Sequence, residues 1–192
     1  MKLTVLPATA ERWPDVEAIF AARGCSIARG CWCMFYRHSG RPQELPSGLS
    51  RADANRAELK ALVNAGRSPG LIGYRGTLPV GWVSLASREE FPKLKRSRIM
   101  KAVDDKPVWS VICFVVPSDY RGQGVAHALL QGAIAYAKRN GATLIEAYPV
   151  DNHGRCSDDD LWFGTKSMYD RAGFEEVARR KTTRPVVRLA VR

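Results

Sequence analysis

The feature that most constrains the fold of this chain is an apolar run at residues 108–116, with the sequence Val-Trp-Ser-Val-Ile-Cys-Phe-Val-Val. A strand with one buried face alternates apolar and polar residues, whereas this run is apolar on both alternating faces. It is therefore typical of a central strand that is covered on both sides. Strands and helices are expected to alternate over the second half of the chain, so the sequence predicts a mixed fold of the α/β (α+β) class.

Capping and turn signals place the other elements around this strand. Ser50, with Asp53 three positions later, has the pattern of a helix start, and Asn140-Gly141 has the pattern of a left-handed helix end. We expect helices at 9–23, 50–65, 124–140 and 165–172, and strands at 3–6, 71–75, 80–86, 108–116, 143–150, 175–179 and 185–191. Glycines and prolines at 24–48 predict a loop with at most a short helical turn. The prediction is a central sheet of about six to seven strands, flanked by about four helices.

Length and composition limit the class of protein. The 192 residues fit a single domain, 1–192, and 45% hydrophobic with 26% charged residues is ordinary for a soluble globular protein. No apolar run approaches the ~20 residues of a membrane span, and Pro7 and Glu11 interrupt the N-terminus before a signal-peptide core could form. Five cysteines without the spacing of a secreted scaffold indicate reduced thiols. We therefore expect a cytoplasmic protein without a membrane partner.

Three of the cysteines lie close together in the sequence. Cys31 and Cys33 flank Trp32, with Cys25 before them and His38 after them. A zinc site is one interpretation of this spacing, but a Cys-x-Cys pair lacks the second pair that closes a tetrahedral site. We expect no metal, and interpret these residues as thiols that pack among aromatic side chains.

The formal net charge of +11 is unevenly distributed. Residues 179–192 contain six Arg and Lys and no acidic residue, and 93–101 contain five more basic residues. Such clusters favour an anionic partner, which would be a phosphorylated cofactor, nucleic acid or an acidic protein face. Residues 179–192 contain no aromatic side chain on which a base would stack. A basic nucleic-acid-binding module is therefore kept only as a distant alternative.

The segment after the apolar run, residues 117–126, carries the strongest chemical signal. Gly122 and Gly124 lie where a strand turns into a helix. Glycines there let several backbone N–H groups point outward together at the positive end of a helix dipole, which suits a phosphate or pyrophosphate. The segment matches neither a Walker loop nor a Gly-x-Gly-x-x-Gly motif. A purely structural glycine turn is the alternative.

Two motifs resemble those of one enzyme family. Residues 121–126, Arg-Gly-Gln-Gly-Val-Ala, are similar to the Arg/Gln-x-x-Gly-x-Gly/Ala signature of the GCN5-related N-acetyltransferases, the GNAT family. Residues 169–174 resemble the Tyr-x-x-x-Gly-Phe segment of the same family, and the order of elements agrees over essentially the whole chain. Residues 30–34 resemble a bacterial branch whose substrates are largely unassigned. The resemblance implies the GNAT fold, with a sheet splayed at the acetyl-CoA site, and an acetyl-CoA-dependent N-acetyltransferase.

The resemblance also implies which residues bind acetyl-CoA. The backbone N–H groups of the helix start would hold the pyrophosphate, and the end of the long strand would pair with the pantetheine amides. The residues concerned are Phe114, Val115, Val116, Arg121, Gly122, Gln123, Gly124, Val125 and Ala126. Many members have an Asn about seven residues before the tyrosine, where this chain reads Leu161-Trp162-Phe163-Gly164. Asn152 is the expected substitute.

The implied reaction is direct attack of a neutral primary amine on the acetyl carbonyl. Tyr169 occupies the position of the family's general acid, and a phenol is a reasonable proton donor to a leaving thiolate. Packing of the Tyr169 ring against the cofactor is the alternative. Glu89 and Glu90 are the candidates for the base that takes the amine's proton, with Glu146 as a further carboxylate near the cleft. The alternative interpretation of each of these carboxylates is a solvated or structural group.

The identity of the acceptor is the least constrained part of the prediction. Trp32, Phe35, Trp82 and Glu146 are expected to line its pocket, together with the rest of the aromatic loop 31–36 and the loop 151–162. Aspartates at 151 and 158–160 suggest a cationic small-molecule amine, unless they only solubilise a loop. The alternatives are a protein N-terminus or lysine as acceptor, and an acyl-CoA-binding protein without turnover. Exposed strands at the C-terminus permit a homodimer.

Overall fold

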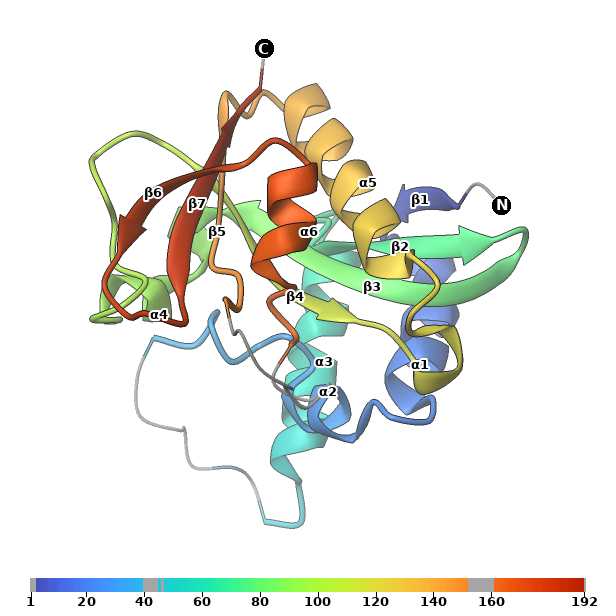
Figure 1. The fold of residues 1–192 in the computed structure, drawn as a ribbon. Helices are drawn as coiled ribbons and strands as arrows, with labels where there is room; N and C mark the ends of the chain where they lie inside the picture. Colours follow the sequence, from blue (N-terminus) through green and yellow to red (C-terminus); the bar gives the residue numbers. More distant parts are fainter. Residues whose placement is uncertain (1–2, 40–44, 46, 152–160, 192) are drawn as a thin grey trace.

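A computed structural model describes residues 3–39, 45, 47–151 and 161–191, and contains one seven-stranded mixed sheet (Figure 1). Its strands, in spatial order, are β1 (Thr4–Pro7), β2 (Gly70–Arg75), β3 (Leu78–Ser87), β4 (Trp109–Val115), β5 (Leu144–Ala147), β7 (Pro185–Ala190) and β6 (Glu175–Arg179). Neighbouring strands are antiparallel except for the parallel pair β4–β5. The mixed α/β fold and the strand count are as predicted.

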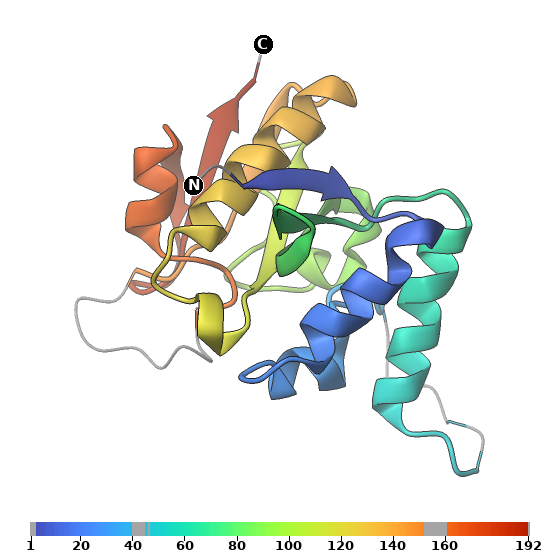
Figure 2. The same cartoon turned by 90° about the vertical axis from the view of Figure 1, so that its right-hand side faces the viewer.

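Helices cover both faces of this sheet (Figure 2). The described residues contain α1 (Trp13–Ala21), α2 (Ser26–Cys31), α3 (Arg51–Asn64), α4 (Pro92–Lys95), α5 (Val125–Arg139) and α6 (Lys166–Arg171). Three short 3-10 turns are η1 (Ala10–Arg12), η2 (Arg88–Glu90) and η3 (Ser118–Tyr120). Helices α5 and α6 pack on one face, and α1, α2 and α3 lie on the other. The sequence predicted about four helices, because α2 and α4 are short helices inside segments that were expected to be loops.

Local capping explains where the helices begin. The Ser50 hydroxyl accepts a hydrogen bond from the Asp53 backbone N–H at 3.1 Å, which confirms the predicted start of α3. The first helix differs from the prediction, because Thr9 makes no side-chain cap and a 3-10 turn precedes α1. Pro14 lacks a backbone N–H and fits only the first turn of a helix, so the α-helix starts immediately before it.

The long strand β4 is buried on both sides, as its composition predicts. Phe114 belongs to the core under α5, together with Leu129 and Leu130, which are fully buried. Val115, the next residue, belongs to the opposite core, which is built around α1 and α3. The central strand therefore contributes to two hydrophobic cores at once, which fixes its position relative to both helical layers.

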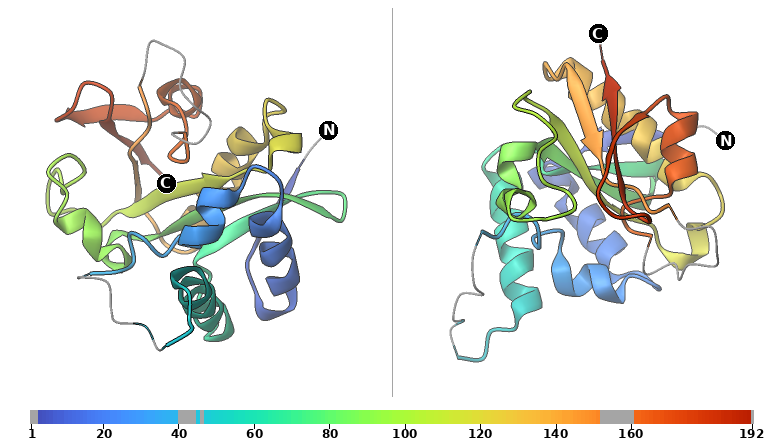
Figure 3. Two further views of the ribbon diagram at one scale, coloured as in Figure 1. Left: turned by 90° about the horizontal axis from the view of Figure 1, so that it is seen from below. Right: turned by 60° about the vertical axis from the view of Figure 1, so that its left-hand side comes forward.

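The sheet splays between β4 and β5, as the family resemblance implies. The two strands pair only from Trp109–Ile145 to Val111–Ala147, and β4 then continues to Val115 without β5 beside it. The β3–β4 register shifts between Ser84 and Leu85, opposite Ile112, which marks a bulge at the point where the pairing ends. Figure 3 shows the sheet from below and from its side. The gap that begins at Ile112 positions the candidate site.

The basic C-terminal segment is largely engaged within the fold. Arg180 donates to the backbone carbonyls of Ile99 and Lys101, at 3.1 and 2.7 Å, and so ties the segment after β6 to the basic stretch before β4. Arg188 forms an ion pair with Asp104 at 2.8 Å. These internal contacts weaken the nucleic-acid alternative, which needs arginines free to reach phosphates. None of the helices built from the described residues has the length and apolar character needed to cross a membrane.

Candidate active site

A cavity of about 690 Å³ lies where β4 and β5 part. Its wall combines the end of β4 (112–116), the turn and first residues of α5 (120–127), α2 with its flanks (24–36) and the segment 161–171. The volume falls within the range of roughly 300–1,000 Å³ that is usual for small-molecule sites. Segments far apart in the sequence therefore meet around a single space that can hold a ligand.

The N-terminus of α5 forms the anion-binding end of this cavity. Gly124, the N-cap, has φ 77°, and Gly122 has φ 70°, so both adopt the left-handed conformation that favours glycine. A Cβ at either position would meet no atom within 4 Å, and no side chain caps the helix. The N–H groups of the first helical turn have no intrahelical partner and lie at the positive end of the dipole. The turn therefore suits a phosphate or pyrophosphate, as predicted.

Arg121 holds this turn in place. Its Nε donates to the Val116 carbonyl at 3.0 Å and its guanidinium donates to the Gly24 carbonyl at 2.7 Å. These bonds connect the turn to the end of β4 and to the loop after α1. Arg121 also lines the cavity, as does Arg171, so two guanidinium groups give its wall positive charge.

Most of the residues assigned to acetyl-CoA lie on the cavity wall. Those that do are Phe114, Val115, Val116, Arg121, Gly122, Gly124, Val125 and Ala126. Gln123 does not line the cavity, because its side chain accepts a hydrogen bond from Arg75 and donates one to the Asp119 carbonyl. Asn152 lies outside the described residues, so its contact with the cofactor stays a prediction.

The edge of β4 is less open than the sequence suggested. The Phe114 backbone N–H donates to the Trp162 carbonyl at 2.6 Å, so a segment of the chain itself takes up a group that was expected to face the pantetheine. Gly164 then turns with φ 77°, and a Cβ there would lie 2.5 Å from the Met168 side chain. The glycine is a sequence signal for this close approach, but nothing in the sequence identifies the carbonyl that reaches Phe114.

Tyr169 lies immediately behind the cavity wall rather than on it. Its side chain is fully buried and its hydroxyl donates to the Phe163 carbonyl at 3.0 Å. The ring packs edge-on against Phe114 and Phe174. Burial, together with the thiol of Cys113, raises the pKa of Tyr169 and keeps the phenol protonated. The wall residues Gly164 and Met168 separate it from the cavity.

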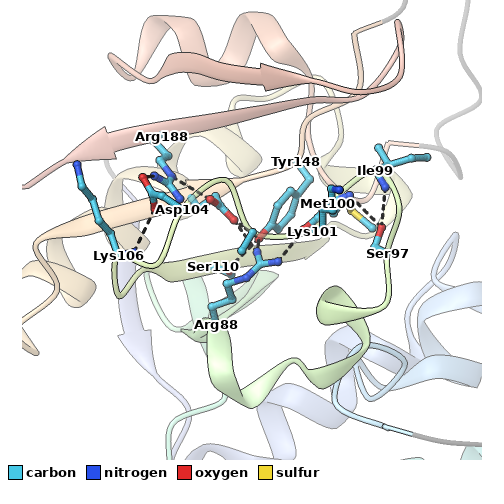
Figure 4. A network of polar contacts seen from close by, with 12 residues as sticks. Arg88, Ser97, Ile99, Met100, Lys101, Asp104, Lys106, Ser110, Tyr148 and Arg188 are labelled. Atoms are coloured by element: carbon cyan, nitrogen blue, oxygen red, sulfur yellow. Dashed lines mark hydrogen bonds and ion pairs between the residues drawn. The ribbon is translucent and has the colours of Figure 1, made fainter.

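The structure does not bring the predicted carboxylates to the cavity. Glu89 is exposed on η2, and Glu90 is held in ion pairs by Arg37 at 2.6 Å and Arg67 at 2.9 Å. Glu146 is fully buried at a different place, where it accepts hydrogen bonds from Arg88, Tyr148 and Arg188. Figure 4 labels these three partners. The direction of side chains in β5 explains this difference, because Glu146 points into a polar network rather than toward the gap.

The acceptor end of the cavity differs from the predicted pocket. Trp32 is buried in a stack with Phe20, whose ring centre is 4.6 Å away, and Trp82 is fully buried against the same Phe20. Both tryptophans are core residues, because large aromatic rings are stabilised more by the core under α1 than by a solvated wall. Of the four residues predicted for the acceptor pocket, Phe35 lines the cavity.

The aromatic loop 31–36 was expected to form part of the acceptor wall, and four of its six residues line the cavity, whereas Cys113 was not identified from the sequence. Tyr36, Cys31, Cys33 and Cys113 belong to the wall there. Burial raises the pKa of Cys31 to about 11 and that of Tyr36 to about 12, so neither is ionised at neutral pH. The density of aromatic residues and cysteines at 31–36 was the available signal. This signal did not show that Trp32 points into the core instead of the pocket, because the backbone path of the segment could not be predicted.

Comparison with known proteins is consistent with this geometry. A family model described as the Acetyltransferase (GNAT) family matches residues 32–157, about two-thirds of the chain. The chain belongs to the GNAT family. It is therefore an N-acetyltransferase whose co-substrate is acetyl-CoA. The GNAT signature was recognised correctly from the sequence. No curated protein matches this GNAT chain.

Several solved structures share the fold of this GNAT enzyme. An acetyltransferase from Thermus thermophilus is 16% identical with a TM-score of 0.53, over 100% of this chain and 98% of the other. An N-acetyltransferase from Staphylococcus aureus is 12% identical with a TM-score of 0.55, over 100% of both chains. The PaiA N-acetyltransferase from Thermoplasma acidophilum, solved in complex with coenzyme A, is 13% identical with a TM-score of 0.51, over 100% of both chains. At these identities the likeness concerns the fold alone.

Proposed function

We propose that this enzyme transfers the acetyl group of acetyl-CoA to a primary amine of a small molecule by direct attack. The observation that carries the proposal is the single cavity that joins the anion-binding start of α5 to the open side of β4. A pyrophosphate at the Gly124 end would direct the rest of the co-substrate along β4 toward Ile112. The reacting carbonyl would then lie among the apolar residues of the acceptor end.

Acetyl-CoA supplies an activated thioester. The amine nitrogen forms a bond to the acetyl carbon, the carbon–sulfur bond breaks, and coenzyme A leaves as a thiolate that takes up one proton. The amine loses one proton in exchange, so that the amide product and free coenzyme A are formed. The apolar walls around the acceptor end favour a neutral amine, since they disfavour the charged ammonium form.

We assign the protonation of the thiolate to Tyr169. Its raised pKa keeps the phenol in the protonated form that a donor requires. Its hydroxyl is bonded to the carbonyl of Phe163, the residue before Gly164 of the cavity wall. Proton donation requires this hydroxyl to leave the Phe163 carbonyl and to move past Gly164 and Met168 toward the sulfur. Catalytic hydrogen bonds often form only when substrate is bound.

The variant Tyr169→Phe tests this assignment. We expect kcat to fall by about 100-fold, with little change in the KM for acetyl-CoA, because general acid catalysis contributes on the order of 10²–10⁴-fold. The measurement is release of free thiol from acetyl-CoA in the presence of an accepted amine.

Tyr36→Phe is the matched control, since Tyr36 lines the cavity itself and, like Tyr169, has a raised pKa. We expect its kcat to remain within a few-fold of the wild-type value. An equal or larger loss in Tyr36→Phe would transfer the role of the acid to Tyr36 and contradict the assignment of Tyr169.

The base that accepts the amine's proton stays a prediction. Glu89 and Glu90 were the candidates, and their positions outside the cavity wall give them no direct path to the amine.

Release of coenzyme A that depends on an added amine distinguishes the proposed transferase from a protein that binds acyl-CoA without turnover.

A further inference from the structure

A second cavity, of about 310 Å³, lies beside the acetyl-CoA cavity and shares Phe35 and Tyr36 with it. The rest of its wall comes from two segments, residues 38–39 and residues 93–100. These wall residues are His38, Ser39, Lys93, Arg96, Ser97 and Met100. Because Phe35 and Tyr36 belong to both walls, one ligand can lie in the first cavity and extend past these two rings into the second.

Basic side chains without an acidic partner distinguish this second cavity. The Lys93 ammonium lies 3.2 Å from the centre of the Phe35 ring, and Lys93 is half-buried. Among the residues that the structure describes, no carboxylate forms an ion pair with Lys93 or Arg96. Glu58, a carboxylate near this wall, is bonded to His38 at 2.7 Å. The cavity therefore presents positive charge that a ligand can neutralise.

The backbone that leads from α2 to the ring pair has an uncommon conformation. Trp32 and Cys33 adopt left-handed backbone conformations with φ 46° and 51°, which are uncommon for residues other than glycine. The stacking of Trp32 on Phe20 stabilises this turn. Strained backbone of this kind is concentrated at functional sites. Here it carries the chain from α2 into Phe35 and Tyr36, whose rings meet edge-on with centres 5.0 Å apart.

We propose that the second cavity binds an anionic group of the acceptor. The acceptor is then a primary amine that also carries a carboxylate or phosphate group. The amine nitrogen lies in the first cavity near Ile112 and Cys113, and the anionic group lies in the second, against Lys93 and Arg96. The inference rests on the proposed function and narrows it to a class of acceptor. Lys93 and Arg96 are then specificity-determining residues that touch the acceptor and do not take part in the transfer of the acetyl group.

This assignment replaces the cationic amine that the acidic residues at 151 and 158–160 suggested. Asp151 is bonded to Arg179 at 2.7 Å, so its charge is already neutralised within the fold. The other three aspartates lie outside the described residues.

A panel of paired acceptors tests the inference. Each pair contains an anionic amine and its neutral analogue: L-phenylalanine with its amide, β-alanine with its amide, and O-phosphoethanolamine with ethanolamine. Spermidine represents the polycations. We expect the kcat/KM of at least one anionic member to exceed that of its neutral partner by about tenfold or more. The reason is that the anion accepts charge-assisted hydrogen bonds from Lys93 and Arg96, which are stronger than those to a neutral group. The carboxylate and phosphate pairs distinguish the two kinds of anion.

Lys93→Met and Arg96→Met should each remove this preference. We expect the KM for the anionic acceptor to rise about tenfold, with kcat and the activity toward the neutral partner nearly unchanged. Lys95→Met is the matched control, because Lys95 lies on the same short helix, is exposed and does not line the cavity. Preference for spermidine or the neutral amines, or an equal effect of Lys95→Met, would overturn the subsite.

Direct binding separates failure of the subsite from failure of the proposed function. Binding of the same anions to the enzyme saturated with coenzyme A is measured by calorimetry, in wild type and Lys93→Met. If no amine is acetylated but the anions bind more tightly than their neutral analogues and Lys93→Met weakens them, the amine transfer fails and the subsite stands. If no anion binds more tightly than its neutral analogue, the subsite is wrong.

Discussion

Replacing Glu146 by alanine is expected to lower the free energy of unfolding by about 3–5 kcal/mol, the loss usual when one partner of a buried ion pair is removed. Glu146 is fully buried and accepts hydrogen bonds from Arg88 at 2.6 Å and Arg188 at 2.9 Å, one on each oxygen. The Tyr148 hydroxyl donates to it as well, at 2.6 Å. Figure 4 shows the labelled partners Arg88, Tyr148 and Arg188 pointing toward one another from η2, the segment after β5 and β7.

The expected loss of stability is large because Glu146→Ala leaves two arginines without their shared carboxylate. Side chains of Arg88 and Arg188 are only 12% and 8% exposed. Without Glu146 both guanidinium groups lose their shared carboxylate in a place where water can hardly replace it. Arg88 also donates to the Met100 carbonyl at 2.7 Å, so the variant is expected to loosen the basic segment that forms the wall of the second cavity.

Urea unfolding of Glu146→Ala and of Glu176→Ala measures this effect. Glu176 pairs with Arg179 at the surface, and its loss should cost no more than about 1 kcal/mol. Similar small losses for both variants would contradict a structural role for Glu146. A stable Glu146→Ala protein without activity would point instead to the place in the acceptor pocket that the sequence suggested.

Ala126→Glu is expected to weaken acetyl-CoA binding by at least about 100-fold while leaving the fold intact. Ala126 lies in the first turn of α5 and lines the cavity beside Gly124. A glutamate there is favourable for the helix, because anions near its N-terminus are stabilised by roughly 0.3–1 kcal/mol. The same charge repels a pyrophosphate: two unit charges 4 Å apart interact by about 4 kcal/mol at an effective dielectric constant of 20. The variant is therefore expected to stabilise the helix slightly and to weaken acetyl-CoA binding, so a loss of binding cannot be attributed to a loss of stability.

Ala135→Glu is the control, because it changes the net charge equally from an exposed position in the same helix. Calorimetric titration with acetyl-CoA should give the wild-type dissociation constant for Ala135→Glu and a greatly increased one for Ala126→Glu. Equal affinities in the two variants would show that the start of α5 does not hold the phosphates.

Local and periodic signals in the sequence predicted much of the fold. The apolar run at 108–116 identified the central strand because only a strand covered on both faces is apolar on both. Ser50 and Gly124 identified helix starts because capping and positive φ depend on the residue itself and its near neighbours. The GNAT motifs then placed the cofactor residues, and those at 114–126 line one cavity, apart from Gln123.

The parts that could not be predicted depend on contacts between distant segments. The Trp162 carbonyl reaches the Phe114 N–H, a contact between residues 48 positions apart that no local pattern specifies. Trp32 and Trp82 are as suitable for a pocket wall as for a core by composition, and the stack with Phe20 decides between the two. Likewise, the partners of Glu146 come from residues 42 and 58 positions away in the chain.

The central claim is that the turn at Gly122 and Gly124 binds the pyrophosphate of acetyl-CoA, and a comparison of Gly124→Ala with Gly141→Ala tests it most directly. These glycines lie at opposite ends of α5, have φ of 77° and 82°, and have open space where a Cβ would be. Either substitution costs about 1–2 kcal/mol of strain, so their effects on stability should match. Titration with acetyl-CoA should give an affinity at least about tenfold lower for Gly124→Ala, equivalent to about 1.4 kcal/mol, and an unchanged affinity for Gly141→Ala. Equal dissociation constants for both variants and the wild type, or a wild-type enzyme that does not bind acetyl-CoA, would contradict it.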